Sequence, residues 1–255
     1  MWVLVGCGYV GTVVAQRLVA AGEEVVATAR RAAPAISGAR GLLFDDATAA
    51  PLPVEGATVV WLAPPRPDVA RLGEVARAAR RFVYVSSTGV YGPAGGAWVD
   101  ETAALAPITA SGKLRVIAEA ALPAGAAILR VAGIYGPGRG LVDRLRAGTY
   151  RIIGDGSHHV SRVHVDDLAT AIVAAGRSEI AGAVNIADDD PAAIGEVGDA
   201  LAERLGLPAP PRVAPAAVDP EVAGMLTADR RIANGRMKRE LGVALRFPSW
   251  RDGAG

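Results

Sequence analysis

Short apolar runs alternate with amphipathic stretches along the first half of the chain. The run 3–5 ends at a glycine, and apolar residues at helical spacing follow it over 12–21. The run 57–63 (ATVVWLA) is almost wholly apolar, which is typical of a strand buried on both faces of a parallel sheet. The pattern predicts strands over 3–5, 24–28, 41–44, 57–63, 81–86, 126–131 and 183–187. It predicts helices over 12–21, 67–80, 107–122, 166–175, 195–205 and 235–241.

The alternation of strands and helices predicts an α/β fold, namely a Rossmann-type, doubly wound parallel sheet with a small C-terminal substrate lobe. Residues 1–135 would form the dinucleotide-binding core, and 162–187 would return to it. Residues 136–161 and 188–255 would form the lobe. Within it, 207–220 is rich in proline and alanine and is expected to be a loop.

A glycine-rich turn joins the first strand to the first helix. Gly6, Gly8 and Gly11 have the spacing G-x-G-x-x-G. In this motif one glycine makes the tight turn, the second lets a pyrophosphate approach the backbone, and the third lets the helix pack closely on the strand. The helix N-terminus also offers free N–H groups to the phosphates. We therefore expect this turn to bind a dinucleotide, with contacts from Gly6, Cys7, Gly8, Tyr9, Val10 and Gly11.

The residues that follow the other strands are further candidates, because ligands of such sheets bind beyond the carboxyl ends of the strands. Cofactor contacts are expected on this ground from Leu62, Ala63, Pro64, Ser86 and Gly133.

Two arginines follow the second strand, where an acidic residue would bind the ribose 2′-hydroxyl of NAD. Arg30 and Arg31 would instead attract the 2′-phosphate of NADP, since a guanidinium group can donate two hydrogen bonds to it. NADP is the expected cofactor and NAD is the alternative, in which these arginines are ordinary solvated loop residues. Asp45, after the third strand, is a candidate for the adenine amino group or a turn-forming residue.

Composition excludes several classes of partner. A net charge of +1 and a pI near 7.9 give no electrostatic case for nucleic acid or an anionic membrane, and no apolar run is long enough to span a bilayer. The one cysteine, Cys7, excludes an intramolecular disulfide, and we expect a cytoplasmic protein. The three histidines lack the spacing of metal ligands, so no metal site is expected.

Several further motifs occur in one order: VYVSSTGVYG at 83–92, LRVAGIYGPG at 129–138 and RVHVDDLA at 162–169. Together with the glycine turn and the tail 234–253, they make nearly the whole chain resemble the extended and atypical short-chain dehydrogenase/reductases. This NAD(P)-dependent epimerase/dehydratase group acts largely on nucleotide sugars.

The resemblance implies roles for individual residues. Ser87 matches the catalytic Ser/Thr that hydrogen-bonds the reacting oxygen. Lys113 matches the lysine of Tyr-x-x-x-Lys, which holds the nicotinamide ribose, although a solvated helix lysine is the plain alternative. Gly133 would lie at the nicotinamide end, and Asp166 would cap the later helix.

The chain departs from this pattern where the tyrosine should stand, because the position four residues before Lys113 is Thr109. A phenol with a lowered pKa can exchange a proton near neutral pH, whereas a threonine hydroxyl cannot. Tyr91, Tyr135 and His164 are the other groups considered for this role, each with a structural alternative.

Two functional hypotheses follow. The first is an NAD(P)-dependent oxidoreductase or epimerase acting on a nucleotide sugar or another small carbonyl or hydroxy compound. Ser87 would polarise the oxygen, Lys113 would fix the ribose, and Thr109 would stand in the acid/base position. The second is a non-catalytic protein that senses the redox state of NADP or binds a partner. The family also makes a homodimer possible.

Overall fold

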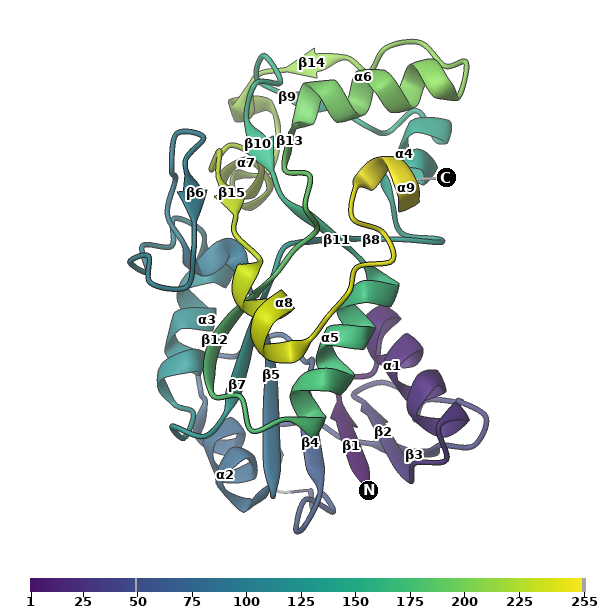
Figure 1. Ribbon diagram of the computed structural model, residues 1–255, viewed down its shortest axis with the longest axis vertical. Helices are drawn as coiled ribbons and strands as arrows, with labels where there is room; N and C mark the ends of the chain where they lie inside the picture. The colour runs from purple at the N-terminus through teal and green to yellow at the C-terminus, as the bar shows by residue number, and fades with distance from the viewer. Residues whose placement is uncertain (49, 254–255) are drawn as a thin grey trace.

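The computed structural model describes residues 1–48 and 50–253. Its centre is a parallel sheet of seven strands in the order β3-β2-β1-β4-β5-β7-β12 (Figure 1). These strands are β1 (Trp2–Val5), β2 (Val25–Ala29), β3 (Arg40–Leu43), β4 (Thr58–Trp61), β5 (Arg81–Ser87), β7 (Ala127–Val131) and β12 (Gly182–Ile186). The order is that of a doubly wound sheet, in which the chain turns back at β1. The predicted fold class and all seven predicted strands are confirmed.

Each face of the sheet is covered by helices, and alternate residues of a strand face opposite layers. Along β1, Trp2 and Leu4 pack toward one layer, and Val3 and Val5 pack toward the other. The first layer contains α1 (Tyr9–Ala20), α5 (Val165–Arg177) and α8 (Gly235–Leu241). The second contains α2 (Ala70–Ala78) and α3 (Ala110–Ala120).

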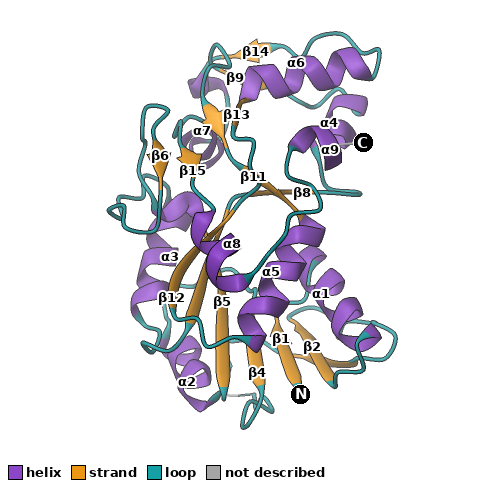
Figure 2. Ribbon diagram, viewed as in Figure 1, coloured by secondary structure: helices purple, strands orange, loops and turns teal. Residues whose placement is uncertain are grey.

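A lobe lies beyond the carboxyl ends of the strands, at the top of Figure 2. Its strands are two or three residues long and pair as β8 with β11, β9 with β14, and β10 with β13. They are β8 (Gly133–Tyr135), β9 (Ile152–Ile153), β10 (His159–Val160), β11 (Arg162–His164), β13 (Ala192–Ala193) and β14 (Arg212–Val213). The helices are α4 (Leu141–Arg146), α6 (Ile194–Arg204), α7 (Pro220–Leu226), α9 (Trp250–Gly253) and the 3-10 turn η2 (Pro215–Ala217). Beside the lobe, β6 (Trp98–Val99) pairs with β15 (Arg231–Ile232), and η1 (Thr88–Val90) follows β5.

The partition of the chain differs from expectation at α8. This helix packs on β12 and α5, and Met237 is fully buried in the layer on that face of the main sheet. The segment 235–243 therefore belongs to the core rather than to the lobe. The expected loop 207–220 contains β14 and η2, and α7 begins at its end.

The first residues of α2 and α5 also differ from the prediction. The predicted helix 67–80 begins at Ala70, because the Asp68 carboxylate accepts a hydrogen bond from the Ala70 N–H instead of allowing an earlier turn. At α5 the cap is His164, whose Nδ1 accepts from the Asp166 N–H, and Asp166 itself pairs with Arg17 of α1 at 2.7 Å. Over the described part of the chain, no helix has the length and apolar character to cross a membrane.

Candidate functional site

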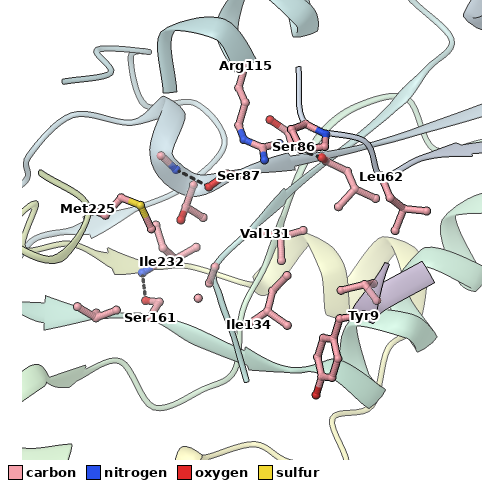
Figure 3. Close-up of a pocket in the computed structure, with 18 of the residues that line it drawn as sticks. Tyr9, Leu62, Ser86, Ser87, Arg115, Val131, Ile134, Ser161, Met225 and Ile232 are labelled. Atoms are coloured by element: carbon pink, nitrogen blue, oxygen red, sulfur yellow. Dashed lines mark hydrogen bonds between the residues drawn. The ribbon is translucent and has the colours of Figure 1, made fainter. Parts of the chain in front are cut away.

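A cavity of about 510 Å³ opens at the carboxyl ends of the central strands, between the sheet and the lobe (Figure 3). The glycine turn forms one side, the ends of β4, β5 and β7 form the floor, and β10 and the α7–β15 segment form the lobe side. Arg115, Arg139 and Arg230 line it, and none of its lining residues in the described chain is acidic. The cavity is therefore suited to an anionic ligand.

A second cavity of about 400 Å³ lies on the other side of the glycine turn. Arg30 and Arg31 line it, and it shares Gly6, Gly8 and Pro64 with the larger cavity. The two cavities adjoin at these residues and together mark a path across the glycine turn.

The backbone of the turn fits a dinucleotide. Gly6 has φ +86°, and a Cβ there would lie 2.6 Å from the Ala63 nitrogen, so only glycine is accommodated. A Cβ on Gly8 would meet nothing within 4 Å, which means that the backbone is open to the cavity where a pyrophosphate would approach. A Cβ on Gly11 would lie 3.0 Å from the Cys7 sulfur, consistent with close packing of α1.

Most of the expected cofactor residues line one of the two cavities. The expected residues found in the lining are Gly6, Cys7, Gly8, Tyr9, Val10, Gly11, Arg30, Arg31, Leu62, Ala63, Pro64, Ser86 and Gly133.

Burial raises the pKa of the Cys7 thiol to about 11, so this thiol is protonated and unreactive at neutral pH.

Asp45 is an exception. Its carboxylate accepts from the Ala47 N–H at 3.0 Å and pairs with Arg66 at 2.7 Å, and these interactions help to hold its pKa below the usual range. The neighbouring Asp46, also paired with Arg66, lines the smaller of the two cavities, and Asp45 does not. Asp45 therefore has the turn-forming role that was the alternative to binding adenine.

The end of β5 places two serines with different environments. Ser87 lines the larger cavity, and its Oγ accepts from the Gly89 N–H at 3.0 Å, which leaves its own proton free to donate to a ligand. The Ser86 hydroxyl instead donates to Glu119 at 2.6 Å, inside a buried network. In that network Glu119 pairs with Arg130, and Arg130 also donates to the Tyr91 hydroxyl.

The structure brings Arg115, and not Lys113, to this cavity. Lys113 is on the exposed side of α3 and is not in the lining. Two residues along an α-helix correspond to a rotation of about 200°, so the side chain of Arg115 points to the opposite side. Arg115 donates to the Val85 carbonyl at 3.1 Å, and its guanidinium points toward Ser86 and Ser87 in Figure 3.

Thr109 is the N-cap of α3 and does not line the cavity. Its Oγ1 accepts from the Gly112 N–H at 3.1 Å, which is a structural role. Counting back four residues from Arg115, along one face of the helix, gives Ser111. The Ser111 hydroxyl donates to Glu221 of α7, whose carboxylate also accepts from two main-chain N–H groups at the start of α3. No tyrosine stands at either position.

The other candidate acids are held in structural roles. Burial raises the pKa of Tyr91 and of Tyr135, so both phenols stay protonated at neutral pH. Burial lowers the pKa of His164, and its Nδ1 already accepts a main-chain hydrogen bond at the start of α5. None of these three side chains is a proton donor poised near neutral pH.

His159 lines the cavity from the lobe side, and the sequence reasoning did not select it. Its Nδ1 lies 3.0 Å from the Asp229 carboxylate, and its Nε2 lies 2.8 Å from the Arg231 guanidinium. Because arginine only donates, Nε2 must accept and Nδ1 carries the proton. The imidazole ring is held in place by these two interactions and presents a polar edge to the cavity. Its partners come from a distant segment of the chain, so no local spacing in the sequence predicts this arrangement.

A metal site is not formed: no group of three or more His, Cys, Asp or Glu side chains suited to a metal occurs within residues 1–48 and 50–253.

A parallel sheet in this strand order, with a glycine turn at the edge of the ligand cavity, defines the Rossmann class of NAD(P)-binding proteins. Comparison with known proteins is consistent with this class. The profile of the "NAD dependent epimerase/dehydratase family" matches residues 68–187. A protein from Streptomyces sp named "3-diazoavenalumate denitrifying reductase" is 37% identical over 208 residues, which cover 73% of this chain and 68% of that protein.

Comparison with solved structures supports the same fold. A functionally unknown conserved protein from Silicibacter pomeroyi DSS superposes with a TM-score of 0.84 at 34% identity, covering 99% of this chain and 95% of that one. The human epimerase family protein SDR39U1 (isoform 2) with NADPH has the same fold, with a TM-score of 0.80 at 24% identity over 99% of this chain and 97% of that one. The chain belongs to the NAD-dependent epimerase/dehydratase family.

Proposed function

We propose that this protein is an NADPH-dependent reductase that acts on a small substrate without a phenolic acid/base. The main support is the path marked by the two adjoining cavities at the glycine turn, with Arg30 and Arg31 at one end and Ser87 and Arg115 at the other. A dinucleotide laid across Gly8 would have its adenosine part near the arginines. Guanidinium groups there favour a 2′-phosphate, which supports NADP over NAD.

The reduced nicotinamide would supply hydride at the Ser87 end of the path. Arg115 would donate to the ribose hydroxyls, the role that the resemblance implies for Lys113. Arg115 lines the cavity, whereas Lys113 is exposed and outside the lining. Ser87 would donate its proton to a polar atom of the substrate, since its oxygen already accepts from Gly89. The lobe side, with His159 and Arg230, would orient the substrate.

The lack of a phenol favours a substrate whose reduction requires no proton from the protein. The name of the Streptomyces relative describes the reduction and denitrification of a diazo compound. When hydride replaces a diazonium group, a C–H bond forms, the C–N bond breaks, and N₂ leaves with the bonding electron pair. No negative charge develops on an oxygen, so no acid is needed. We therefore propose an aryl diazonium compound as the substrate class, with a carbonyl compound as the alternative.

The test is a substrate panel that includes aryl diazonium salts, aldehydes and ketones, with NADPH consumption as the readout. With an aryl diazonium substrate we expect NADPH oxidation and N₂ release, and Ser87→Ala should lower kcat/KM by less than about tenfold, since no oxyanion forms. With a carbonyl substrate the same variant should lose about 10²–10³-fold, as for removal of an oxyanion donor. Ser37→Ala, an exposed serine outside both cavities, is the matched control.

Binding of NADPH without turnover across the panel would overturn the proposed reductase and favour the non-catalytic sensor. Such a sensor must bind NADP⁺ and NADPH with different affinities, because equal affinities shift no equilibrium.

A further inference from the structure

The short strand β15 and the residue before it present alternate side chains to the larger cavity. Arg230 and Ile232 line the cavity, whereas Arg231 between them does not. This alternation is expected because successive side chains of an extended segment point to opposite sides. It directs the side chain of Arg230 toward the lobe side of the cavity, across from the glycine turn.

The guanidinium group of Arg230 is buried and is held by one of its three nitrogens. The residue is 8% exposed. Its Nη1 donates to the Tyr91 carbonyl at 2.8 Å and to the Gly92 carbonyl at 3.2 Å. Both acceptors are main-chain oxygens directly after η1, so the guanidinium group is fixed relative to the end of β5.

The other two nitrogens of Arg230 are unused and accessible. Nε and Nη2 make no hydrogen bond in the described structure, and neither is among its unpaired polar atoms that are closed to solvent. These donors are therefore open to a ligand in the cavity that Arg230 lines. Nε–H and Nη2–H form one edge of the planar group, and such an edge matches the two oxygens of a carboxylate.

No carboxylate of the described chain occupies this edge. Arg230 takes part in none of its salt bridges, and none of the described lining residues is acidic. The adjacent Asp229 carboxylate accepts instead from the main-chain N–H and the ring of His159. A buried charge without a counter-charge is costly, so an anionic ligand would be stabilised here.

Ser161 adds a hydroxyl donor on the same side of the cavity. The residue is buried and lines the cavity, and its Oγ accepts from the Ile232 N–H at 2.9 Å (Figure 3). This bond leaves the hydroxyl proton free to donate to a ligand. Because Ile232 and Arg230 face the same side, the hydroxyl and the guanidinium lie along one wall.

The charge on this wall matches a carboxylate better than a phosphate ester. The other two arginines of the described lining are engaged elsewhere: Arg115 donates to the Val85 carbonyl, and Arg139 lies over the Tyr9 ring at 5.5 Å. Arg230 is left as the one cation on the described lobe side. A single positive charge balances a carboxylate, whereas a phosphate monoester carries nearly two negative charges at neutral pH.

We propose that Arg230 anchors the substrate by a carboxylate group, so that the substrate of this reductase is an organic acid. The Nε–Nη2 edge holds the two carboxylate oxygens, and the Ser161 hydroxyl donates to one of them. The uncharged part of the substrate extends toward Ser87, where the reduced cofactor supplies hydride. Only this last contact rests on the proposed function, because the carboxylate contact itself requires neither NADPH nor turnover.

The test is calorimetric titration of the full chain with benzoate, benzamide and phenyl phosphate at constant ionic strength, both without cofactor and with saturating NADP⁺. The three probes share a phenyl ring and differ in the group that Arg230 would contact. Benzoate should bind saturably and at least about tenfold more tightly than benzamide, as expected for hydrogen bonds between charged groups. Tighter binding of phenyl phosphate than of benzoate would contradict a carboxylate site.

Arg230→Gln removes the charge and should reduce the preference for benzoate over benzamide to within about twofold. The matched control is Arg212→Gln, which removes an exposed arginine of the lobe outside both cavities and should keep the preference. Circular dichroism and melting temperature show whether each variant is folded. If Arg230→Gln does not fold, Arg230→Lys provides the test, because it keeps the charge but loses the paired donors and should weaken benzoate binding about tenfold.

Two sets of outcomes separate this inference from the proposed function. Absence of saturable benzoate binding, equal affinities for benzoate and benzamide, or an unchanged preference in folded Arg230→Gln would overturn the carboxylate site and leave the reductase standing. A benzoate preference that depends on Arg230 in a protein that binds no NADP⁺ would support the carboxylate site and overturn the reductase.

Discussion

Glu119 and Arg130 form an ion pair with an N–O distance of 2.8 Å in which both side chains are almost fully buried. Glu119 comes from α3 and Arg130 from β7, and the Ser86 hydroxyl of β5 donates to the same carboxylate. The pair therefore ties one helix and two strands together beside the wall of the larger cavity.

Glu119→Gln should destabilise the fold by about 3–5 kcal/mol, because it leaves the Arg130 charge buried without its partner. The free energy of unfolding from urea titrations followed by circular dichroism measures this. The matched control is Glu74→Gln, since Glu74 forms an exposed pair with Arg71 at 3.1 Å and should change stability by about 0–1 kcal/mol. Equal effects of the two substitutions would show that the buried pair is not stabilising.

Arg115→Ala should weaken NADPH binding about tenfold or more, because hydrogen bonds from a charged donor are lost. Lys113→Ala should change the dissociation constant less than about twofold, because the side chain is exposed and outside the cavity. Fluorescence titration with NADPH measures both. A larger effect of Lys113→Ala would restore the assignment made from the Tyr-x-x-x-Lys resemblance.

The double variant Arg30→Ala/Arg31→Ala should lose NADPH affinity by about 10–100-fold and leave NADH affinity nearly unchanged, since only NADPH carries the 2′-phosphate. The wild type should bind NADPH more tightly than NADH. Paired titrations with both cofactors give the ratio, and Arg239→Ala, an exposed arginine on α8, is the control. Tighter binding of NADH by the wild type would identify NAD as the cofactor.

Asp188 should make stability depend on pH. Burial raises its pKa in the folded state from the ordinary value of 3.8 to about 8, so the folded state holds the proton more tightly than the unfolded chain. The stabilisation is full below about pH 4 and is lost as the pH rises toward 8, at up to about 1.4 kcal/mol per pH unit. Because asparagine does not ionise, the stability of Asp188→Asn should not fall over this pH range.

Unfolding free energies of the wild type and Asp188→Asn between pH 5 and pH 8 test this linkage, and the difference should move in favour of the variant as the pH rises. A wild type that remains the more stable protein at pH 8 would indicate an ionised Asp188 stabilised by the charge of Arg162.

The seven strands of the main sheet could be predicted from sequence because strands buried on both faces are apolar, and this signal is local. The strands of the lobe could not, because runs of two or three residues such as Ile152–Ile153 have no periodicity. Their pairing partners come from distant segments, and for Ile152–Ile153 the partner is Arg212–Val213. Likewise, α8 is amphipathic in sequence, but only its contact with β12 and α5 assigns it to the core.

The sequence by itself determined the glycine turn, because the backbone conformation at Gly6, the open backbone at Gly8 and the close approach at Gly11 are requirements of residue type and spacing. Tertiary structure decided which side chains reach the ligand. The packing of α3 turns Arg115 inward and Lys113 outward, although both are cations separated by one residue. It also decided that Arg230 is buried at the larger cavity, because burial depends on segments brought together from across the chain.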